Sequence, residues 1–543
     1  MERCILTSIL LDTTSPVRLC TMSSEHSASI GYGPRAGADK RGPRFWLIFF
    51  ANLVVDLLSA LDLTAVSTAL PTIVEQLHGS DFIWDENLFY LDLSHFFAIG
   101  SAICGSAQSL NMLIAGRVVQ GIGGGGCISV TEIIYADLVP LPERGKFVGI
   151  TASVWAFACA IGPPIGGALS GSNAWRWLFF LNIPLCAIAF LLVTLFLKVQ
   201  TPREGLRNMI STVDWVGLIL LVTGTISITI SLAWAGIEHP WSSKQVLVPF
   251  CVGFGAIGAF IIVEYKFRVA KVPTIPSFLV TNRTTLSGYI GTSIHGIVSM
   301  AAIFYIPVYF QACKLDSPIR SGIDLLGFAF VIPVLAILSG VSVQLMDRYR
   351  PQNYIGWMFT MVGFGLFTLL DKDSSKSTYI GFQVVLGVGL GIIWISTQFP
   401  ILAPLPFSNN AHALAFFTFV RCFSQTWGTV FGGTILQNTL KARLPAQFID
   451  TFGSGAQLTY AVIQQINALP VELRDQVRDV FAQGVKIVWY TMLGISGLGL
   501  LSCLLMEEVK LRNALDEAWG MDVTDCTELG LTAVGAASTA KEI

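Results

Sequence analysis

Arg117 stands inside a long apolar run of this sequence, and its type and place point to chemistry. A charged side chain at bilayer depth costs roughly 2.5–3.5 kcal/mol on insertion scales, so one that persists usually faces a polar interior and marks a pathway. On a helix this arginine shares one stripe with Gln120, Gly121 and Gly124. The glycines let a neighbouring backbone approach while the cation and the amide face inwards. The pattern indicates transport across a membrane.

Carboxyl groups at membrane depth complete the candidate set. An opposite charge within about 4–6 Å favours the ionised form of a carboxyl group and burial favours the neutral form, so movement between the two surroundings would bind and release a proton. Asp62 lies in the first apolar run, Glu132 lies about four turns beyond the arginine, and Arg421 lies in a late run. The alternative for each is a contact that only holds helices together. The residues predicted to serve transport or proton coupling are Asp62, Arg117, Gln120, Glu132 and Arg421.

A stripe of small residues marks a later apolar run. Its members recur every four positions, and Pro163-Pro164 within it removes two backbone donors and bends a helix. The stripe suits a hinge beside a central cavity, or a plain tight crossing of two helices. The residues of the stripe are Ala158, Gly162, Gly166 and Ser170.

The composition sets the class of protein. Of 543 residues, 53% are hydrophobic and 13% are charged, and apolar runs recur along nearly the whole length, which predicts an all-α polytopic membrane protein. The net charge of −2 and the scatter of basic residues over short loops imply no nucleic-acid partner. The eleven cysteines show no C-x-x-C pair and no Cys/His metal spacing, so we expect free thiols, no metal and no cofactor.

Runs of about 20 apolar residues predict about 13 membrane-spanning helices. The segment 438–483 between the last two carries an amphipathic stretch, expected to lie along the membrane surface or to cap the helices. The expected spans are near 45–70, 88–108, 112–136, 147–170, 177–198, 214–235, 246–265, 286–311, 322–345, 353–371, 378–400, 411–437 and 484–506.

Basic residues near the ends of spans mark the cytoplasmic side. The clusters from Arg144 to Lys510 are separated by even numbers of spans, so they all lie on one side. Arg41 and Arg44 also predict a cytoplasmic position, yet three spans separate them from Arg144. An odd number cannot return the chain to the same side. The count therefore predicts that one span is missing, near 84–88.

Several short motifs, in this order and spacing, resemble the fourteen-span drug/proton antiporter branch of the major facilitator superfamily, especially its fungal multidrug or toxin efflux pumps. The resemblance runs from about Phe45 to Arg512. It also identifies the missing piece as the second span and its following loop. The motifs are Leu61-Asp62-Leu63-Thr64, Gly116 to Gly121, Asp137 to Pro140 with Glu143-Arg144-Gly145-Lys146, Gly162-Pro163 with Gly166-Gly167, and Trp175-Arg176-Trp177 with Phe180 to Pro184.

The resemblance implies roles for these residues. Arg117 would take part in proton coupling. An antiporter-type helix motif that restrains leak would consist of Gly162, Pro163, Gly166 and Gly167. A gating loop would consist of Asp137, Arg144 and Gly145, with Asp347 and Arg348 as its counterpart in the second half.

The resemblance also implies the organisation of the chain. We expect two pseudo-symmetric helical bundles with two extra central helices between them. The expected parts are a disordered cytosolic tail at 1–44, the N-terminal bundle at 45–198, a linker and two central helices at 199–265, the first part of the C-terminal bundle at 266–437, a non-cytoplasmic loop at 438–483, the last span at 484–508 and a cytosolic tail at 509–543.

By resemblance, the chain would be a secondary transporter, not an enzyme, that exports hydrophobic drugs, toxins or secondary metabolites in exchange for protons. It would reside in the lipid bilayer of the plasma membrane or, as the alternative, the vacuolar membrane. Two functional alternatives stay open: a siderophore or basic amino-acid carrier of the same fold, and a non-transporting truncated isoform.

Overall fold

The computed structural model describes the chain in segments, and the predicted break near 84–88, the tail 1–44 and the linker 199–213 lie outside them. The described residues are 46–47, 49–62, 94–139, 141–172, 174–196, 214–236, 239–267, 275–406, 409–445, 448 and 463–511. Within these segments the regular secondary structure is helical, apart from one isolated bridge between Ala235 and His239. The prediction of an all-α polytopic membrane protein is confirmed.

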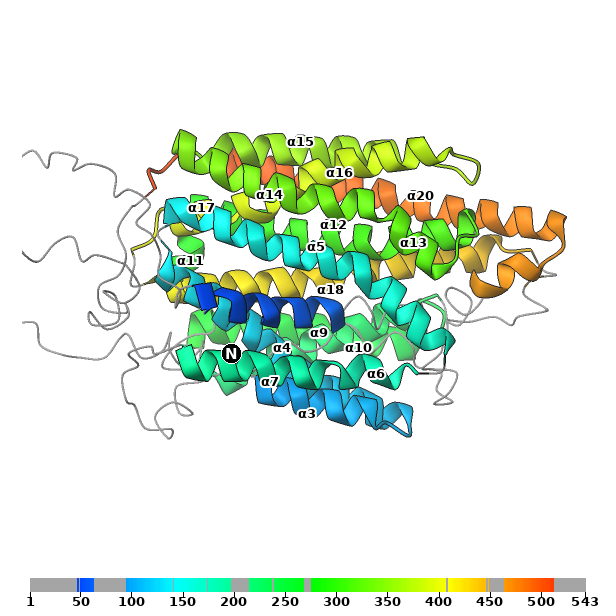
Figure 1. The fold of residues 1–543 in the computed structure, drawn as a ribbon, viewed down its shortest axis with the longest axis horizontal. Coiled ribbons are helices and arrows are strands. Elements are labelled where there is room, and N and C mark those ends of the chain that lie inside the picture. Colours follow the sequence, from blue (N-terminus) through cyan, green and yellow to red (C-terminus); the bar gives the residue numbers. More distant parts are fainter. Residues whose placement is uncertain are drawn as a thin grey trace, which may run out of the picture.

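The helices run side by side along one long axis (Figure 1). The first described helical residues are 46–47 and 49–62. The others are α3 (Ser94–Gly105), α4 (Leu110–Leu138), α5 (Leu141–Gly171), α6 (Arg176–Phe180), α7 (Asn182–Phe196), α9 (Trp215–Trp234), α10 (Lys244–Ile262), α11 (Phe278–Thr281), α12 (Arg283–Cys313), α13 (Pro318–Asp324), α14 (Leu326–Met346), α15 (Arg350–Phe367), α16 (Lys376–Ser396), α17 (Gln398–Leu402), α18 (Asn410–Arg443) and α20 (Val471–Ser502).

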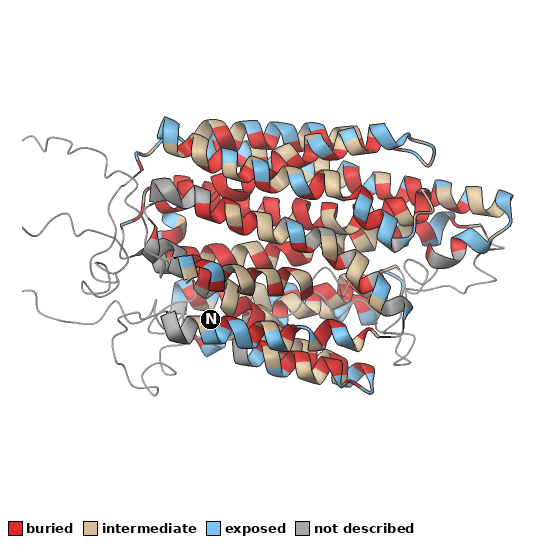
Figure 2. Cartoon of the chain, viewed as in Figure 1, coloured by how far each residue is buried: buried red, intermediate tan, exposed pale blue. Residues whose placement is uncertain are grey.

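Length and composition identify the helices that can cross a bilayer. Among the described residues, six are long and apolar enough, and they contain α9, α10, α12, α14, α16 and α20. Their outward faces carry large apolar side chains such as Phe330, Leu338 and Leu345, which are 61%, 55% and 74% exposed (Figure 2). Contiguous exposed apolar surface of this kind suits contact with hydrocarbon.

The buried core is divided unequally between the two halves of the chain. The larger cluster fills the space among α12, α14, α15, α16, α18 and α20, and it includes Val148 and Ala152 of α5. A smaller cluster gathers Trp175 and Phe179 against Cys104 and Leu113 of α3 and α4. Helix α5 therefore connects the first half to the core of the second half.

Glycine allows the closest crossing near the candidate site. A Cβ on Gly123 of α4 would lie 2.1 Å from the backbone nitrogen of Phe97 in α3, and one on Gly100 of α3 would lie 2.2 Å from that of Gln120. Only glycine lets the two backbones approach this closely. The crossing positions Gln120 directly against α3.

The amphipathic stretch and the last span form one continuous helix, α20, which begins at Val471. The stretch therefore continues the last span rather than forming a separate helix. It extends the last span beyond its neighbours (Figure 1) and buries Val477, Val480 and Phe481. Helix α18 likewise continues to Arg443, past the predicted start of the loop at 438.

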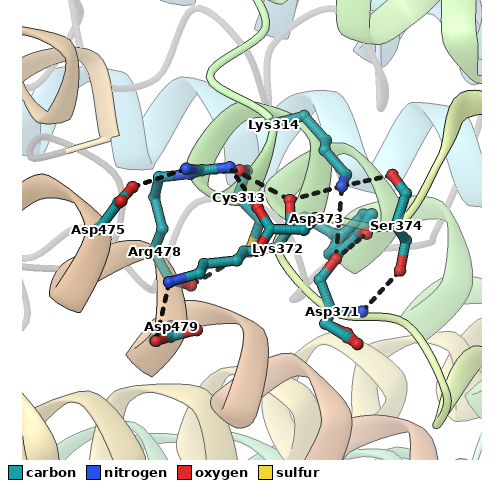
Figure 3. Close-up of polar contacts among 10 residues, drawn as sticks. Cys313, Lys314, Asp371, Lys372, Asp373, Ser374, Asp475, Arg478 and Asp479 are labelled. Carbon is teal, nitrogen blue, oxygen red and sulfur yellow. Dashed lines mark hydrogen bonds and ion pairs between the residues drawn. The ribbon is translucent and has the colours of Figure 1, made fainter.

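Polar contacts fasten this end of α20 to α12 and to the α15–α16 loop (Figure 3). Arg478 donates from Nε to the Cys313 carbonyl at 2.8 Å and from Nη1 to Asp475 Oδ1 at 2.8 Å. Lys314 Nζ donates to the carbonyls of Lys372 at 2.6 Å and Ser374 at 2.7 Å. Burial disfavours its ammonium form and lowers the pKa of Lys314. We refer to these residues as the Lys314–Arg478 cluster.

Candidate functional site

Asp62 is the centre of a buried hydrogen-bond network drawn from four helices. Its carboxylate is 8% exposed and accepts from Arg117 Nη1 at 2.5 Å, from Gln120 Nε2 at 2.9 Å and from Asn182 Nδ2 at 3.1 Å. Ser101 Oγ accepts from the same amide groups, at 2.9 Å from Gln120 and 3.4 Å from Asn182. We call these residues the Asp62 network.

The helical spacing of α4 brings its two members together. Arg117 and Gln120 lie one turn apart, and Arg117 Nη1 also donates to Gln120 Oε1 at 2.8 Å. The Gln120 side chain is 1% exposed, so it holds a fixed position between the arginine and the acid. This agrees with the sequence-based prediction that the cation and the amide face inwards.

The Asp62–Arg117 ion pair is largely buried. The Arg117 side chain is 12% exposed, and its guanidinium lies 5.9 Å from the centroid of the buried Phe179 ring. A charge pair of this kind is strongly coupled, and removing one partner leaves the other as an uncompensated buried charge.

Asn182 and Ser101 belong to the site although the sequence did not single them out. Asn182 is the first residue of α7 and is 3% exposed, and Ser101 lies in α3 and is fully buried. Neutral polar residues are common in membrane helices, so neither gives a strong signal by its type. The signal available was the motif at Phe180 to Pro184, which contains Asn182.

A second charged site joins the two halves of the chain. Glu132 Oε1 of α4 lies 3.9 Å from Arg421 Nη1 of α18, and Glu132 Oε2 accepts from Gln398 Nε2 of α17 at 3.2 Å. The two charged side chains are 9% and 11% exposed. We call this contact the Glu132–Arg421 bridge.

Aromatic rings fix the arginine of the bridge. The Arg421 guanidinium lies 4.3 Å from the centroid of Phe417 and 4.9 Å from that of Trp394, and Nη2 donates to the Trp394 carbonyl at 2.9 Å. The Trp394 ring in turn lies 6.2 Å from that of Trp155 in α5. Cation–π contacts and the hydrogen bond to the Trp394 carbonyl therefore fix the guanidinium from the second-half side of the bridge.

The five predicted coupling residues thus form two sites rather than one. Arg117 and Glu132 share α4, but they are about 22 Å apart along a helix that rises 1.5 Å per residue. The sequence did not predict that Glu132 and Arg421 would form one pair, or that Asp62 and Arg117 would form a separate one.

The other predicted site residues lie outside these two sites. Gly162 and Gly166 are buried in α5, which stays helical through Pro163 and Gly167. Asp347, in a left-handed conformation with φ of 52°, ends α14, and it is exposed like Arg348. The side chains of Asp137, Arg144 and Gly145 are outside the described part of the structure, so the gating loop stays a prediction.

In the described segments no group of three or more His, Cys, Asp or Glu side chains could hold a metal ion. Among the described residues the geometry shows two buried ion pairs, one within the first half of the chain and one between the two halves.

Comparisons with known proteins agree with the helical architecture. A model of the Major Facilitator Superfamily matches residues 94–429. The efflux pump FUS6 of Gibberella fujikuroi is 34% identical over 91% of this chain and 94% of its own length. The MFS-type transporter pydD of an Acremonium species is 36% identical over 89% of this chain and 90% of its own length. A bacterial homologue of the human lysosomal transporter Spinster, solved in an inward-facing and occupied conformation, shares the fold with a TM-score of 0.53 at 15% identity, over 88% of this chain and 99% of its own.

Proposed function

Because the chain belongs to the major facilitator superfamily, we propose that it exports hydrophobic organic compounds, such as toxins or other secondary metabolites, in exchange for protons. Its relatives are named efflux pumps and transporters, including one named for an acurin A biosynthesis cluster, which supports export of small metabolites. By family habit we propose the plasma membrane as its residence, which a fluorescent fusion would test.

The observation that carries the proton exchange is the Asp62 network. In this network the buried carboxylate of Asp62 accepts hydrogen bonds from Arg117, Gln120 and Asn182. If the helices move so that Arg117 withdraws, the isolated carboxylate takes up a proton, and it gives that proton up when Arg117 returns. One cycle of movement then carries one proton in the direction opposite to the substrate.

The Glu132–Arg421 bridge supplies a contact between the two bundles that their separation would break. Alternating access requires the bundles to separate on one side of the membrane while they close on the other. Glu132 lies in the first bundle and Arg421 in the second, so separation on this side breaks the bridge. Breaking it costs free energy, because each group is left buried without its partner.

Transport into inside-out vesicles with an imposed proton gradient tests the proposal. The vesicles carry the full chain, and the probes are a lipophilic fluorescent dye, an iron siderophore and arginine. We expect gradient-driven uptake of the dye that a protonophore abolishes. Uptake of the siderophore or of arginine instead would support the other carriers of the fold, and dye uptake that a protonophore leaves unchanged would exclude proton exchange.

The variant Asp62→Asn sharpens this test. It keeps the size of the side chain and removes the ionisable group, so we expect loss of gradient-driven uptake, with dye exchange down its own gradient retained. Asp373→Asn, at a carboxylate whose side chain is 77% exposed, serves as the matched control and should leave uptake unchanged.

A further inference from the structure

Arg421 of α18 is a buried cation whose hydrogen-bonding capacity is largely unused. A guanidinium carries five N–H donors. In the part of the chain that the structure describes, Arg421 makes one hydrogen bond, from Nη2 to the Trp394 carbonyl at 2.9 Å, and its buried Nε has no partner. The side chain is only 11% exposed. Unused donors on a buried cation cost free energy, so the site favours a further acceptor.

Glu132 supplies the counter-charge of Arg421 without a hydrogen bond to it. Its Oε1 lies 3.9 Å from Arg421 Nη1, whereas a hydrogen bond between a guanidinium and a carboxylate spans about 2.7–2.9 Å. Glu132 Oε2 instead accepts from Gln398 at 3.2 Å. A mobile carboxylate can meet a guanidinium with two parallel hydrogen bonds. A carboxylate that is not attached to α4 can therefore bind Arg421 more closely than Glu132 does.

An aromatic pair joins the two halves of the chain beside the bridge. The Trp155 ring of α5 lies 6.2 Å from the Trp394 ring of α16. The same Trp394 ring lies 4.9 Å from the Arg421 guanidinium, and the His295 ring of α12 packs nearly perpendicular to it at 5.6 Å. Arg421 and Trp394 thus form one surface of the second half. Against this surface the first half places one ring, from Trp155, and one carboxylate, from Glu132.

Both contacts join opposite halves, so a separation of the halves at this place parts them together. Arg421 then stays on the second half with the rings of Phe417 and Trp394 but without a counter-charge. An uncompensated cation at membrane depth is costly. A cargo molecule that carries its own carboxylate and its own aromatic ring would replace both of the lost contacts.

We propose that Arg421 and Trp394 recognise the cargo, and that the cargo is an aromatic carboxylic acid in its ionised form. The proposal rests on export as proposed above and names the class of compound exported. The cargo carboxylate replaces Glu132 at the guanidinium, and the cargo ring replaces Trp155 against Trp394. The cargo thereby offsets the cost of breaking the Glu132–Arg421 bridge and favours the separated arrangement. A neutral compound of the same shape leaves Arg421 unpaired.

Calorimetric titration of the purified full chain with two matched probes tests the site without a proton gradient. The probes are 2-naphthoate and the uncharged 2-naphthamide, at about pH 7.5, where the acid is ionised. We expect the wild type to prefer the acid, because hydrogen bonds to charged groups are stronger than those between neutral groups. Arg421→Gln should bind the two probes alike.

Glu132→Gln gives a result that a purely structural bridge would not. It removes the internal carboxylate that competes for Arg421, so it should bind the acid more tightly than the wild type does and prefer it to the amide by at least about tenfold. It also tests the proposal if Arg421→Gln fails to fold. The exposed Arg443→Gln is the control and should match the wild type with both probes. A Glu132→Gln protein with no preference for the acid, or with no gain over the wild type, would overturn the proposal.

These titrations are independent of proton exchange. A chain that prefers the acid in solution but takes it up into vesicles equally with and without a proton gradient would contradict proton exchange and support the cargo site. A chain that shows gradient-driven uptake of the dye but binds the acid and the amide equally, also as Glu132→Gln, would retain the proposed export and overturn the cargo site.

Discussion

Glu132 of α4 and Arg421 of α18 face each other across the two bundles, with Oε1 and Nη1 3.9 Å apart. The same helix α4 carries Arg117, which pairs with Asp62 inside the first bundle. One helix therefore contributes the cation of one buried pair and the anion of another. A movement of α4 relative to α18 alters the bridge directly, and it reaches the Asp62 network through α4 itself.

A double-mutant cycle at the bridge should reveal coupling between the bundles. Glu132→Gln keeps an acceptor for Gln398 but leaves Arg421 without its counter-charge. Arg421→Gln removes the cation and leaves Glu132 without its counter-charge. We expect each single variant to lower stability in detergent by about 3 kcal/mol and the double variant to cost clearly less than the sum. Thermal unfolding of the four proteins measures this.

The exposed Arg443→Gln, near the end of α18, is the matched control for this cycle. It should change stability by under about 0.5 kcal/mol. Strictly additive losses at Glu132 and Arg421 would show that the two side chains do not interact in the folded protein.

Asn182 should set the pH dependence of transport through Asp62. Asn182→Asp removes the donor that lies 3.1 Å from Asp62 Oδ1 and adds a second acid. Two carboxyl groups at this distance do not both ionise. The pair should therefore keep a proton to higher pH, which would shift the pH profile of transport towards alkaline pH. Asn182→Leu removes the donor without adding an acid and should lower the rate with no alkaline shift. Identical pH profiles for the two variants would exclude this role.

The sequence singles out the charged members of these sites, which the structure places in two buried ion pairs. Arg117 and Asp62 are costly in an apolar run whatever their partners are, so their type and depth alone predicted a function. Asn182 and Ser101 were missed because a neutral polar side chain gains its role only from the helices that pack around it. Those contacts depend on where α3 and α7 lie against α4, and no local pattern encodes that.

The pairing of Glu132 with Arg421 and the continuity of α20 show the same limit. Each charged residue was predicted singly, but their meeting depends on the packing of α4 against α18. In α20, the change from amphipathic to apolar composition predicts a break between two segments. No proline interrupts the chain from Val471 to Ser502, so the backbone continues as one helix while its surroundings change.

Gly123 should be far less tolerant of substitution than its neighbour. In Gly123→Ala the new Cβ would lie 2.1 Å from the backbone nitrogen of Phe97, whereas in Gly124→Ala it would meet only the Phe97 ring, at 3.3 Å. Backbone cannot yield as a ring can, so we expect Gly123→Ala to cost about 1–3 kcal/mol or more. Separation of α3 from α4 would also weaken the bond from Gln120 to Ser101 and slow transport. Equal stability and rates for the two variants would contradict this account.

Arg478 should hold the protruding end of α20, and its neighbour Arg474 should not. Arg478 donates to the carbonyls of Cys313 at 2.8 Å and Lys372 at 3.2 Å (Figure 3), whereas Arg474 Nε, one turn earlier, is buried with no hydrogen-bond partner in the described structure. We expect Arg478→Ala to lower stability by about 2–4 kcal/mol, because buried carbonyls lose a charged donor, and Arg474→Ala to cost much less.

Arg478→Lys separates geometry from charge in the same test. A lysine ammonium cannot reproduce the planar fork that reaches Cys313 and Lys372 together, so most of the loss should remain. The loss should also depend little on salt, because the main acceptors are carbonyls rather than exposed carboxylates. Thermal unfolding at low and high ionic strength measures both effects. Full rescue by lysine, or a loss that salt removes, would show that net charge rather than these two hydrogen bonds fastens α20 to α12.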